Sequence, residues 1–180
     1  SVDSQPIKML RYTAKKYSVA VSFGYYELCD EAIYSSYMFI GKGGEIVNNF
    51  RRVSKGWKEY DITDEHYKEG DGFKTFTYMG KRIALAVCGD LWYEENIEQI
   101  NKEKFDFLLY PVYVTYNTEM WRTKLVNEYA EQAKKIPRPV FLVNSICDAD
   151  NTRGGCYAFL NGKTVCEVPM GQDGYLLVRV

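Results

Sequence analysis

The stretch that decides the fold is RIALAVCGDLW, residues 82–92. Its apolar run, 83–87, is typical of a strand buried on both faces, so a strand is predicted over 82–88. Cys88 then stands where the strand meets a loop, with Gly89 beside it. A nucleophile at such an elbow projects out of the sheet, and the neighbouring glycine lets a substrate approach the backbone closely. Cys88 is therefore the first candidate nucleophile, with a buried structural thiol as the alternative.

The flanking segments predict an α/β domain with a mixed sheet. Residues 4–17 carry apolar side chains at helical spacing. Gly43 and Gly44 supply the positive φ that a tight hairpin turn requires. Polar residues 53–72 predict a long loop. The remaining predicted elements are strands at 18–23, 32–41, 45–52, 73–78, 105–112, 140–144, 155–160, 164–168 and 175–180, and helices at 96–104 and 119–135.

Composition limits the classes of function. The 180 residues, expected to form one domain over 1–180, carry 23 basic and 24 acidic side chains and a net charge of −1. That balance disfavours bulk electrostatic capture of nucleic acid or of an anionic membrane, and no apolar run is long enough to span a membrane. Five scattered cysteines without a CxxC pair indicate reduced thiols and a cytoplasmic location. With His66 as the single histidine, a His-rich zinc site is excluded.

Polar side chains near predicted strand ends are further candidates. An arginine pair ends the 45–52 strand, where surface ion pairs are common. Glu65 and His66 lie in the polar loop, and a thiol–imidazole pair of Cys88 and His66 stays open beside a plain solvated loop. Glu27 follows a buried strand and is either a substrate contact or a strand-end carboxylate.

Aromatic side chains gather near predicted strand ends and loops. They are Tyr25, Tyr26, Trp57, Trp92, Tyr113 and Tyr116. They could line a partly aromatic pocket, and packing at a subunit interface is an equally good interpretation. Trp92 follows the Cys88 elbow, so we expect it beside the substrate or at a subunit seam.

A series of short motifs follows the chain in a characteristic order. It runs Gly24-Tyr25-Tyr26-Glu27, Tyr34-Ser35-Ser36, Arg51-Arg52, Glu65 ahead of Gly70-Asp71, Cys88-Gly89-Asp90, Tyr110-Pro111-Val112, Trp121, Ala130-Glu131-Gln132, Val143-Asn144 and Gly154-Gly155-Cys156. Each motif is weak alone. In this order, over nearly the whole chain, they resemble the nitrilase or carbon–nitrogen hydrolase superfamily.

The resemblance implies an αββα sandwich with mixed sheets and covalent catalysis by a cysteine. In that family the thiol attacks an amide, carbamoyl or nitrile carbon of a small molecule, and water hydrolyses the acyl-enzyme. By this likeness Cys88 is the nucleophile and Glu65 a supporting carboxylate. A cation, Arg52 or Lys55, would hold the oxyanion together with a backbone N–H. The family has lysine where this chain has Arg52, which stays charged but exchanges no proton.

The substrate contacts expected from the sequence are Glu27, Lys55, Gly89, Trp92 and Tyr113. The reaction requires no metal or cofactor, and a homo-oligomer is expected.

The general-base glutamate of the family lies on a strand before the helix at 4–17. The resemblance therefore implies that the sequence is incomplete at its N-terminus, either as a fragment or as a natural truncation. The alternative function is a catalytically inactive binding or assembly module. A flavodoxin-like binding protein is disfavoured, because no Gly-x-Gly-x-x-Gly motif follows a strand.

Overall fold

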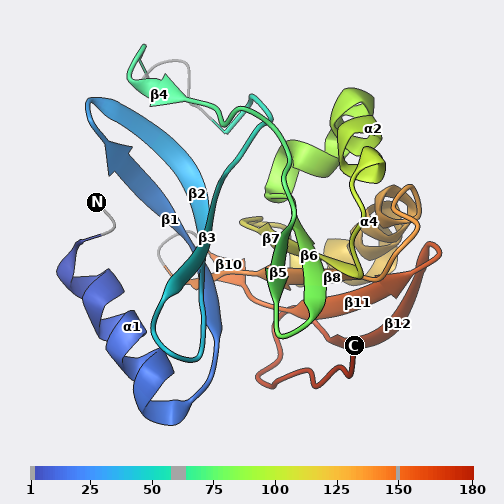
Figure 1. Ribbon diagram of the computed structural model, residues 1–180. Coiled ribbons are helices and arrows are strands. Elements are labelled where there is room, and N and C mark those ends of the chain that lie inside the picture. Colours follow the sequence, from blue (N-terminus) through green and yellow to red (C-terminus); the bar gives the residue numbers. More distant parts are fainter. Residues whose placement is uncertain (1–2, 58–63, 149–150) are drawn as a thin grey trace. The chain divides into compact units, whose positions relative to one another are not determined.

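A computed structural model describes residues 3–57, 64–148 and 151–180 (Figure 1). The chain divides into two compact units, which are described separately. The first comprises Ser1–Gly72 and Tyr78–Gly80, and the second comprises Phe73–Thr77 and Lys81–Val180.

The first unit is a helix packed on an antiparallel sheet. Helix α1 (Gln5–Tyr17) precedes strands β1 (Val21–Cys29), β2 (Ala32–Ile40) and β3 (Ile46–Arg51), which pair in that order. A short strand, β4 (Tyr67–Lys68), pairs with β2 in parallel.

The core of the first unit lies between α1 and one face of the sheet. Ile7 and Ala14 of the helix pack with Met38 and Ile40 of β2. This confirms the helix that the apolar spacing predicts. Removing these side chains from water drives the packing, because each buried aliphatic side chain contributes about 1.5–3 kcal/mol.

The strand predicted at 18–23 is wrong in its bounds. Ser18 has a φ of 53° and ends α1, while β1 starts at Val21 and continues to Cys29. A tight turn at Asp30, whose φ is also 53°, joins β1 to β2. Pairing with β2 along its full length extends the strand, so that Glu27 lies within it.

The second unit is a six-stranded mixed sheet with the order β12-β11-β8-β7-β6-β5. Its strands are β5 (Phe76–Tyr78), β6 (Lys81–Leu85), β7 (Phe107–Val112), β8 (Val140–Asn144), β11 (Cys156–Leu160) and β12 (Lys163–Val168). Strands β6, β7 and β8 are parallel, while β11 and β12 are antiparallel to their neighbours. Two short strands, β9 (Ile146–Cys147) and β10 (Thr152–Arg153), form a separate ribbon.

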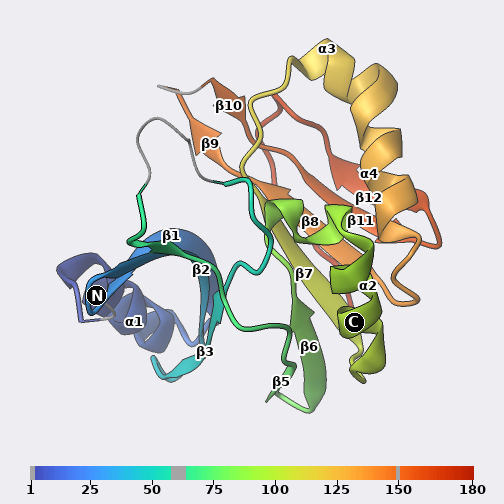
Figure 2. The ribbon, with the colours of Figure 1, turned by 90° about the horizontal axis from the view of Figure 1, so that it is seen from above.

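Helices cover one face of this sheet. Helix α2 is Glu94–Lys102, and a second helical segment runs through α3 (Thr118–Met120), the π-helical turn η2 (Trp121–Leu125) and α4 (Val126–Ala133). Figure 2 shows α2 and α4 along the same side of the sheet. Tyr110, Leu142 and Tyr157 share that face by register, and all three are buried.

Three predictions for this unit need correction. Strand β6 ends at Leu85, and Cys88 begins a 3-10 helix, η1 (Cys88–Trp92), instead of ending a strand. Residues 175–180 form no strand. The helix predicted at 119–135 runs from 118 to 133 and contains a π-helical turn. Local patterns do not reveal these boundaries, because partners distant in sequence decide where pairing stops.

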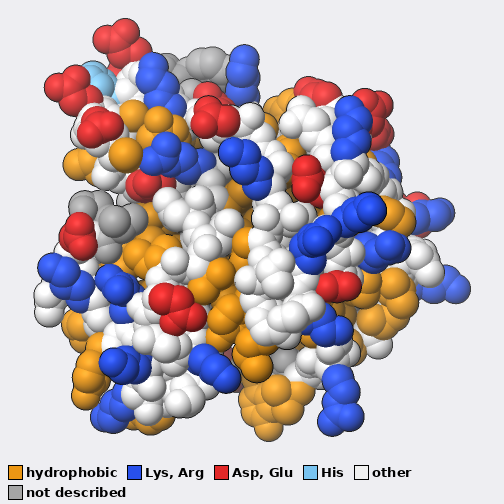
Figure 3. Space-filling view, in the orientation of Figure 1, with side chains coloured by type: hydrophobic (Ala, Val, Ile, Leu, Met, Phe, Trp, Pro, Cys, Tyr) orange, Lys and Arg blue, Asp and Glu red, His pale blue; other side chains and the backbone are white. Residues whose placement is uncertain are grey.

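Charge is evenly distributed over the visible surface. Basic and acidic side chains are interspersed on the face in Figure 3, as the balanced counts imply. Within the described ranges, no helix is long and apolar enough to cross a membrane.

Candidate functional site

In the second unit, Cys88 stands at a sharp elbow. Its φ is 48°, a left-handed conformation that few residues with a Cβ adopt. The thiol-bearing residue is free and half-buried. The elbow follows β6 and leads directly into η1, so Cys88 begins a 3-10 helix and does not stand at the strand-to-loop junction that the sequence predicts.

The elbow is closed by hydrogen bonds from the residues around it. The Val87 N–H donates to Asp90 Oδ2 at 2.8 Å, and the Asp90 N–H donates to the Val87 carbonyl at 3.0 Å. Asn96 Nδ2 donates to the Asp90 carbonyl at 3.1 Å. Asp90 is fully buried, and the bond from the Val87 N–H satisfies one oxygen of a carboxylate that would otherwise be costly to bury.

Tyr110 bonds the Cys88 backbone from the neighbouring strand. Its hydroxyl donates to the Cys88 carbonyl at 2.6 Å, and its side chain is fully buried. The Trp92 indole N–H in turn hydrogen-bonds the Tyr110 side chain. Burial raises the pKa of Tyr110 well above its usual value, and electrostatic interactions with the neighbouring Tyr129, Cys88 and Asp90 side chains add to the shift. The hydroxyl therefore keeps its proton.

An aromatic cluster of Trp92, Tyr116, Trp121, Tyr129 and Tyr157 adjoins the elbow. Trp92 meets Tyr129 edge-on at 5.1 Å, and Trp121 lies 4.9 Å from Tyr129 between ring centroids. Trp121 Nε1 donates to the Tyr157 hydroxyl at 2.7 Å. Burial first, and then the electrostatic interaction with the neighbouring Cys88 side chain, raise the pKa of Tyr129.

The predicted substrate contacts of the second unit differ in exposure and packing. Trp92 is 42% exposed and packs on Tyr129, and Tyr113, just beyond β7, is 47% exposed. Gly89 is half-buried in η1 next to Cys88. The buried side chain of Asn144 bonds the Val114 N–H, the Val114 carbonyl and the Gly154 carbonyl, which fixes the loop that carries Tyr113.

In the first unit, Glu27 is the centre of a polar network. Tyr25 and Glu27 of β1, Tyr34 and Ser36 of β2, and Asn49 and Arg51 of β3 share one sheet face by register. Glu27 accepts two bonds from Arg51, from Nε at 3.0 Å and from a terminal nitrogen at 2.8 Å. It also accepts from Ser36 at 2.7 Å and from Asn49 at 3.0 Å.

This network keeps Glu27 ionised. Burial acts to raise the pKa of Glu27, but the hydrogen bonds from Arg51, Ser36 and Asn49 outweigh it and lower the pKa. The Arg51 guanidinium also stacks on Tyr34, 3.8 Å from the ring centroid. The carboxylate of Glu27 is buried and accepts four hydrogen bonds from protein side chains. Its acceptor sites are therefore occupied, which favours a structural role for Glu27 over the predicted substrate contact.

The two adjacent arginines have different partners. Arg51 pairs with Glu27, whereas Arg52 is buried and donates from Nε to Ser54 Oγ at 2.8 Å. The Arg52 backbone extends the ladder, because its N–H bonds the Ser35 carbonyl and its carbonyl accepts from Gly70 at 2.8 Å each. The sequence identifies the two arginines as candidates but does not predict that they bind different partners.

The remaining first-unit candidates lie at the surface. Lys55 and Glu65 are exposed. His66 Nδ1 lies 2.9 Å from Asp64 Oδ1, an exposed pair that gives the histidine a local partner.

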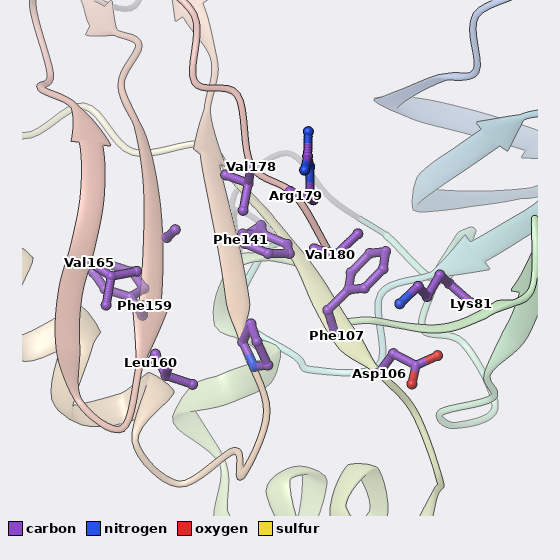
Figure 4. A pocket seen from close by; sticks show the side chains of 12 residues that line it. Lys81, Asp106, Phe107, Phe141, Phe159, Leu160, Val165, Val178, Arg179 and Val180 are labelled. Carbon is purple, nitrogen blue, oxygen red and sulfur yellow. The ribbon is translucent and has the colours of Figure 1, made fainter.

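The second unit also holds a cavity of about 360 Å³. Figure 4 shows Phe107 and Phe141 on one wall and Val178 and Val180 on another. Its wall includes Phe141, whose register places it opposite the helix-covered side chains. None of the predicted site residues lines it. Within the part of the chain that the structure describes, no group of three or more His, Cys, Asp or Glu side chains could hold a metal.

The sequence profile of the carbon–nitrogen hydrolase family matches residues 1–180. The chain therefore belongs to the carbon–nitrogen hydrolase family, and the predicted resemblance to that family is confirmed. Among characterised proteins it is similar to a citrullinase of Francisella tularensis, with 25% identity over 117 residues, 62% of this chain and 40% of the relative.

Solved structures share the fold. A carbon–nitrogen hydrolase from Helicobacter pylori G27 matches with a TM-score of 0.74 and 16% identity, over 92% of this chain and 63% of its own. An amidase from Nesterenkonia sp. AN1 in complex with butyramide matches with a TM-score of 0.72 and 14% identity, over 91% and 62%. Another structure of that amidase carries the acetamide moiety of fluoroacetamide on its active-site cysteine. The predicted nitrilase-like fold is confirmed, and the chain spans less than two thirds of each of these relatives.

Proposed function

We propose that this protein is a cysteine-dependent hydrolase of a non-peptide C–N bond in a small molecule. The observation that carries the proposal is the Cys88 elbow, a half-buried thiol on a left-handed residue held by partly buried hydrogen bonds. Membership of the carbon–nitrogen hydrolase family supports this chemistry.

In the proposed reaction, the thiol proton of Cys88 passes to a carboxylate and the sulfur attacks the substrate carbonyl carbon. A C–S bond forms and the carbonyl oxygen becomes an oxyanion. The C–N bond then breaks, and the amine leaves with the proton. Water attacks the resulting thioester, which releases a carboxylic acid and restores the thiol. We assign the general base to the glutamate that family members carry on an earlier strand, with Glu65 as a supporting carboxylate.

The oxyanion needs donors that are in place before charge develops. We assign this role to the Gly89 N–H and to a cation, Arg52 in preference to Lys55. Arg52 is buried and its guanidinium is oriented by Ser54, whereas Lys55 is exposed. A preorganised fork of donors suits a tetrahedral oxyanion better than an ammonium on an exposed, flexible side chain.

Two substrate classes fit the proposal. The amidase neighbours favour a small aliphatic amide, and the citrullinase relative favours a ureido compound, in which a carbamoyl group is cleaved from nitrogen. Trp92 and Tyr113 are the proposed side-chain contacts for either substrate, since both are partly exposed. Trp92 ends η1, which begins at Cys88, and Tyr113 lies just beyond β7, the strand next to β6. We further propose a cytoplasmic homo-oligomer, as the sequence predicts.

Ammonia release tests the proposal directly. Full-length protein is incubated with a panel of aliphatic amides and ureido amino acids, and Cys88→Ala is compared with Cys156→Ala, a half-buried free thiol on β11. We expect turnover of at least one class, a loss of about 10³-fold or more in Cys88→Ala because the nucleophile is gone, and retained turnover in Cys156→Ala. Equal turnover in both variants would refute the role of Cys88. No turnover of any substrate by the unmodified protein favours the inactive binding or assembly module.

A further inference from the structure

The backbone of Cys88 is held in a conformation that costs free energy. A left-handed residue with a Cβ persists only where the surroundings over-determine it, and such residues concentrate at functional sites. The bonds among Val87, Asp90 and Asn96 close the turn on either side of Cys88. None of these three bonds involves an atom of Cys88 itself.

Tyr110 supplies the contact to Cys88. Its hydroxyl reaches the Cys88 carbonyl from β7, the strand next to β6 in the sheet, at 2.6 Å. Tyr110 is fully buried and the bond is partly buried, so water replaces it incompletely when it is broken. The indole N–H of Trp92 occupies the oxygen of the same hydroxyl, which directs the Tyr110 proton toward Cys88.

We propose that Tyr110 is a positioning residue for the nucleophile: through its hydroxyl it holds the Cys88 carbonyl, and thereby the left-handed backbone that presents the thiol. Trp92 orients this hydroxyl, so Trp92 helps to position the Cys88 backbone in addition to its proposed contact with the substrate. The inference rests on the proposed function, in which Cys88 is the attacking group. It adds a residue that the sequence motifs did not assign to the site.

The test measures the thiol without any substrate. Full-length protein is treated with iodoacetamide, and the alkylation rate of each cysteine is followed by peptide mass spectrometry. We expect Tyr110→Phe to slow alkylation of Cys88 about tenfold, because losing this hydrogen bond shifts the elbow toward conformers that withdraw the thiol. The rates at Cys29, Cys147, Cys156 and Cys166 serve as internal references, since these cysteines are also free and half-buried.

A matched variant separates positioning from loss of stability. Tyr157→Phe removes another buried tyrosine hydroxyl, which bonds Trp121 and the Met170 N–H instead of Cys88. We expect it to lower the melting temperature and leave the Cys88 rate unchanged. General loosening would speed alkylation of all five cysteines, whereas loss of positioning slows Cys88 alone, so the two effects have opposite signs.

Two results overturn the proposal. The first is an unchanged or faster rate at Cys88 in folded Tyr110→Phe. If that variant does not fold, Trp92→Phe is measured, for which we expect a two- to threefold slower rate at Cys88, and an unchanged rate again overturns the proposal. Because alkylation needs no amide substrate, failure of the proposed hydrolase activity is recorded separately, in the ammonia assay.

Discussion

Replacing Glu27 by glutamine tests the polar network of the first unit. The substitution keeps the size of the side chain but removes its charge and one acceptor oxygen. The NH₂ group of the new amide is a donor and would face one of the three side chains that donate to Glu27, namely Arg51, Ser36 or Asn49. Two donors cannot form a hydrogen bond with each other, so at least one bond is lost. We expect the variant to fold with a clearly lower free energy of unfolding.

The magnitude follows from the bonds that are lost. Glu27 is 4% exposed and accepts four hydrogen bonds, two of them from Arg51. Hydrogen bonds to charged groups contribute about 1.5–3 kcal/mol each. The Arg51 side chain is 31% exposed, so water recovers part of its loss. A destabilisation of about 2–4 kcal/mol is therefore expected, below the sum of two charged bonds.

The pH dependence gives a second signature. The folded state lowers the pKa of Glu27 from 4.5, because the hydrogen bonds from Arg51, Ser36 and Asn49 outweigh the effect of burial. The unfolded state therefore binds a proton at higher pH than the folded state. The stability that Glu27 contributes is present above about pH 4.5 and is lost as the pH falls through the folded-state pKa. The difference between the original protein and Glu27→Gln should shrink over that range.

Urea unfolding at several pH values measures both signatures. Glu131→Gln is the control, because its partner Lys134 lies 3.3 Å away and both side chains are exposed, so we expect less than about 1 kcal/mol. A free-energy loss in Glu27→Gln no larger than in this control, or one that does not change below pH 4.5, would refute the reasoning.

Two further predictions concern the segment around Arg52. Arg52→Ala should lower kcat about 100-fold or more, by the loss of an oxyanion donor, while Lys55→Ala stays within about threefold; the reverse order in the ammonia assay would make Lys55 the cation. Gly70→Ala should lower the melting temperature more than Gly80→Ala does. A Cβ at Gly70 would lie 2.4 Å from the Arg51 carbonyl oxygen, whereas one at Gly80 meets nothing within 4 Å. The cost at Gly80 is then confined to its φ of 78°, about 1 kcal/mol. Equal melting temperatures in a thermal scan would contradict the close approach.

The Cys88 elbow could be predicted from the sequence because its signals are local. A continuous apolar run, a cysteine and a glycine are neighbours in the chain, and this order predicts a buried strand followed by a junction. The helix over residues 4–17 was predictable for the same reason, since its apolar spacing lies within one segment. The polar turn at Asp30 between two apolar runs was a usable signal for the β1–β2 hairpin, and it was missed.

Glu27 and Tyr110 depend on pairing between distant segments. Glu27 meets Arg51 because β1, β2 and β3 bring residues 24 positions apart onto one sheet face. Tyr110 meets Cys88 because β7 lies beside β6 in parallel register. A tyrosine or glutamate in a strand predicts neither partner, since register and strand order decide which side chains meet.

The sequence by itself determined the family, the nucleophile candidate and the mixed α/β class, because these depend on the kinds of residues and their order along the chain. The tertiary structure alone decided that Cys88 adopts a left-handed backbone and that Arg51 and Arg52 have different partners. It also decided that the Glu27 carboxylate accepts four hydrogen bonds. The physical reason is that burial and hydrogen bonding are properties of assembled strands. A side chain acquires its partners when distant segments pair, and those partners determine its protonation state and its orientation.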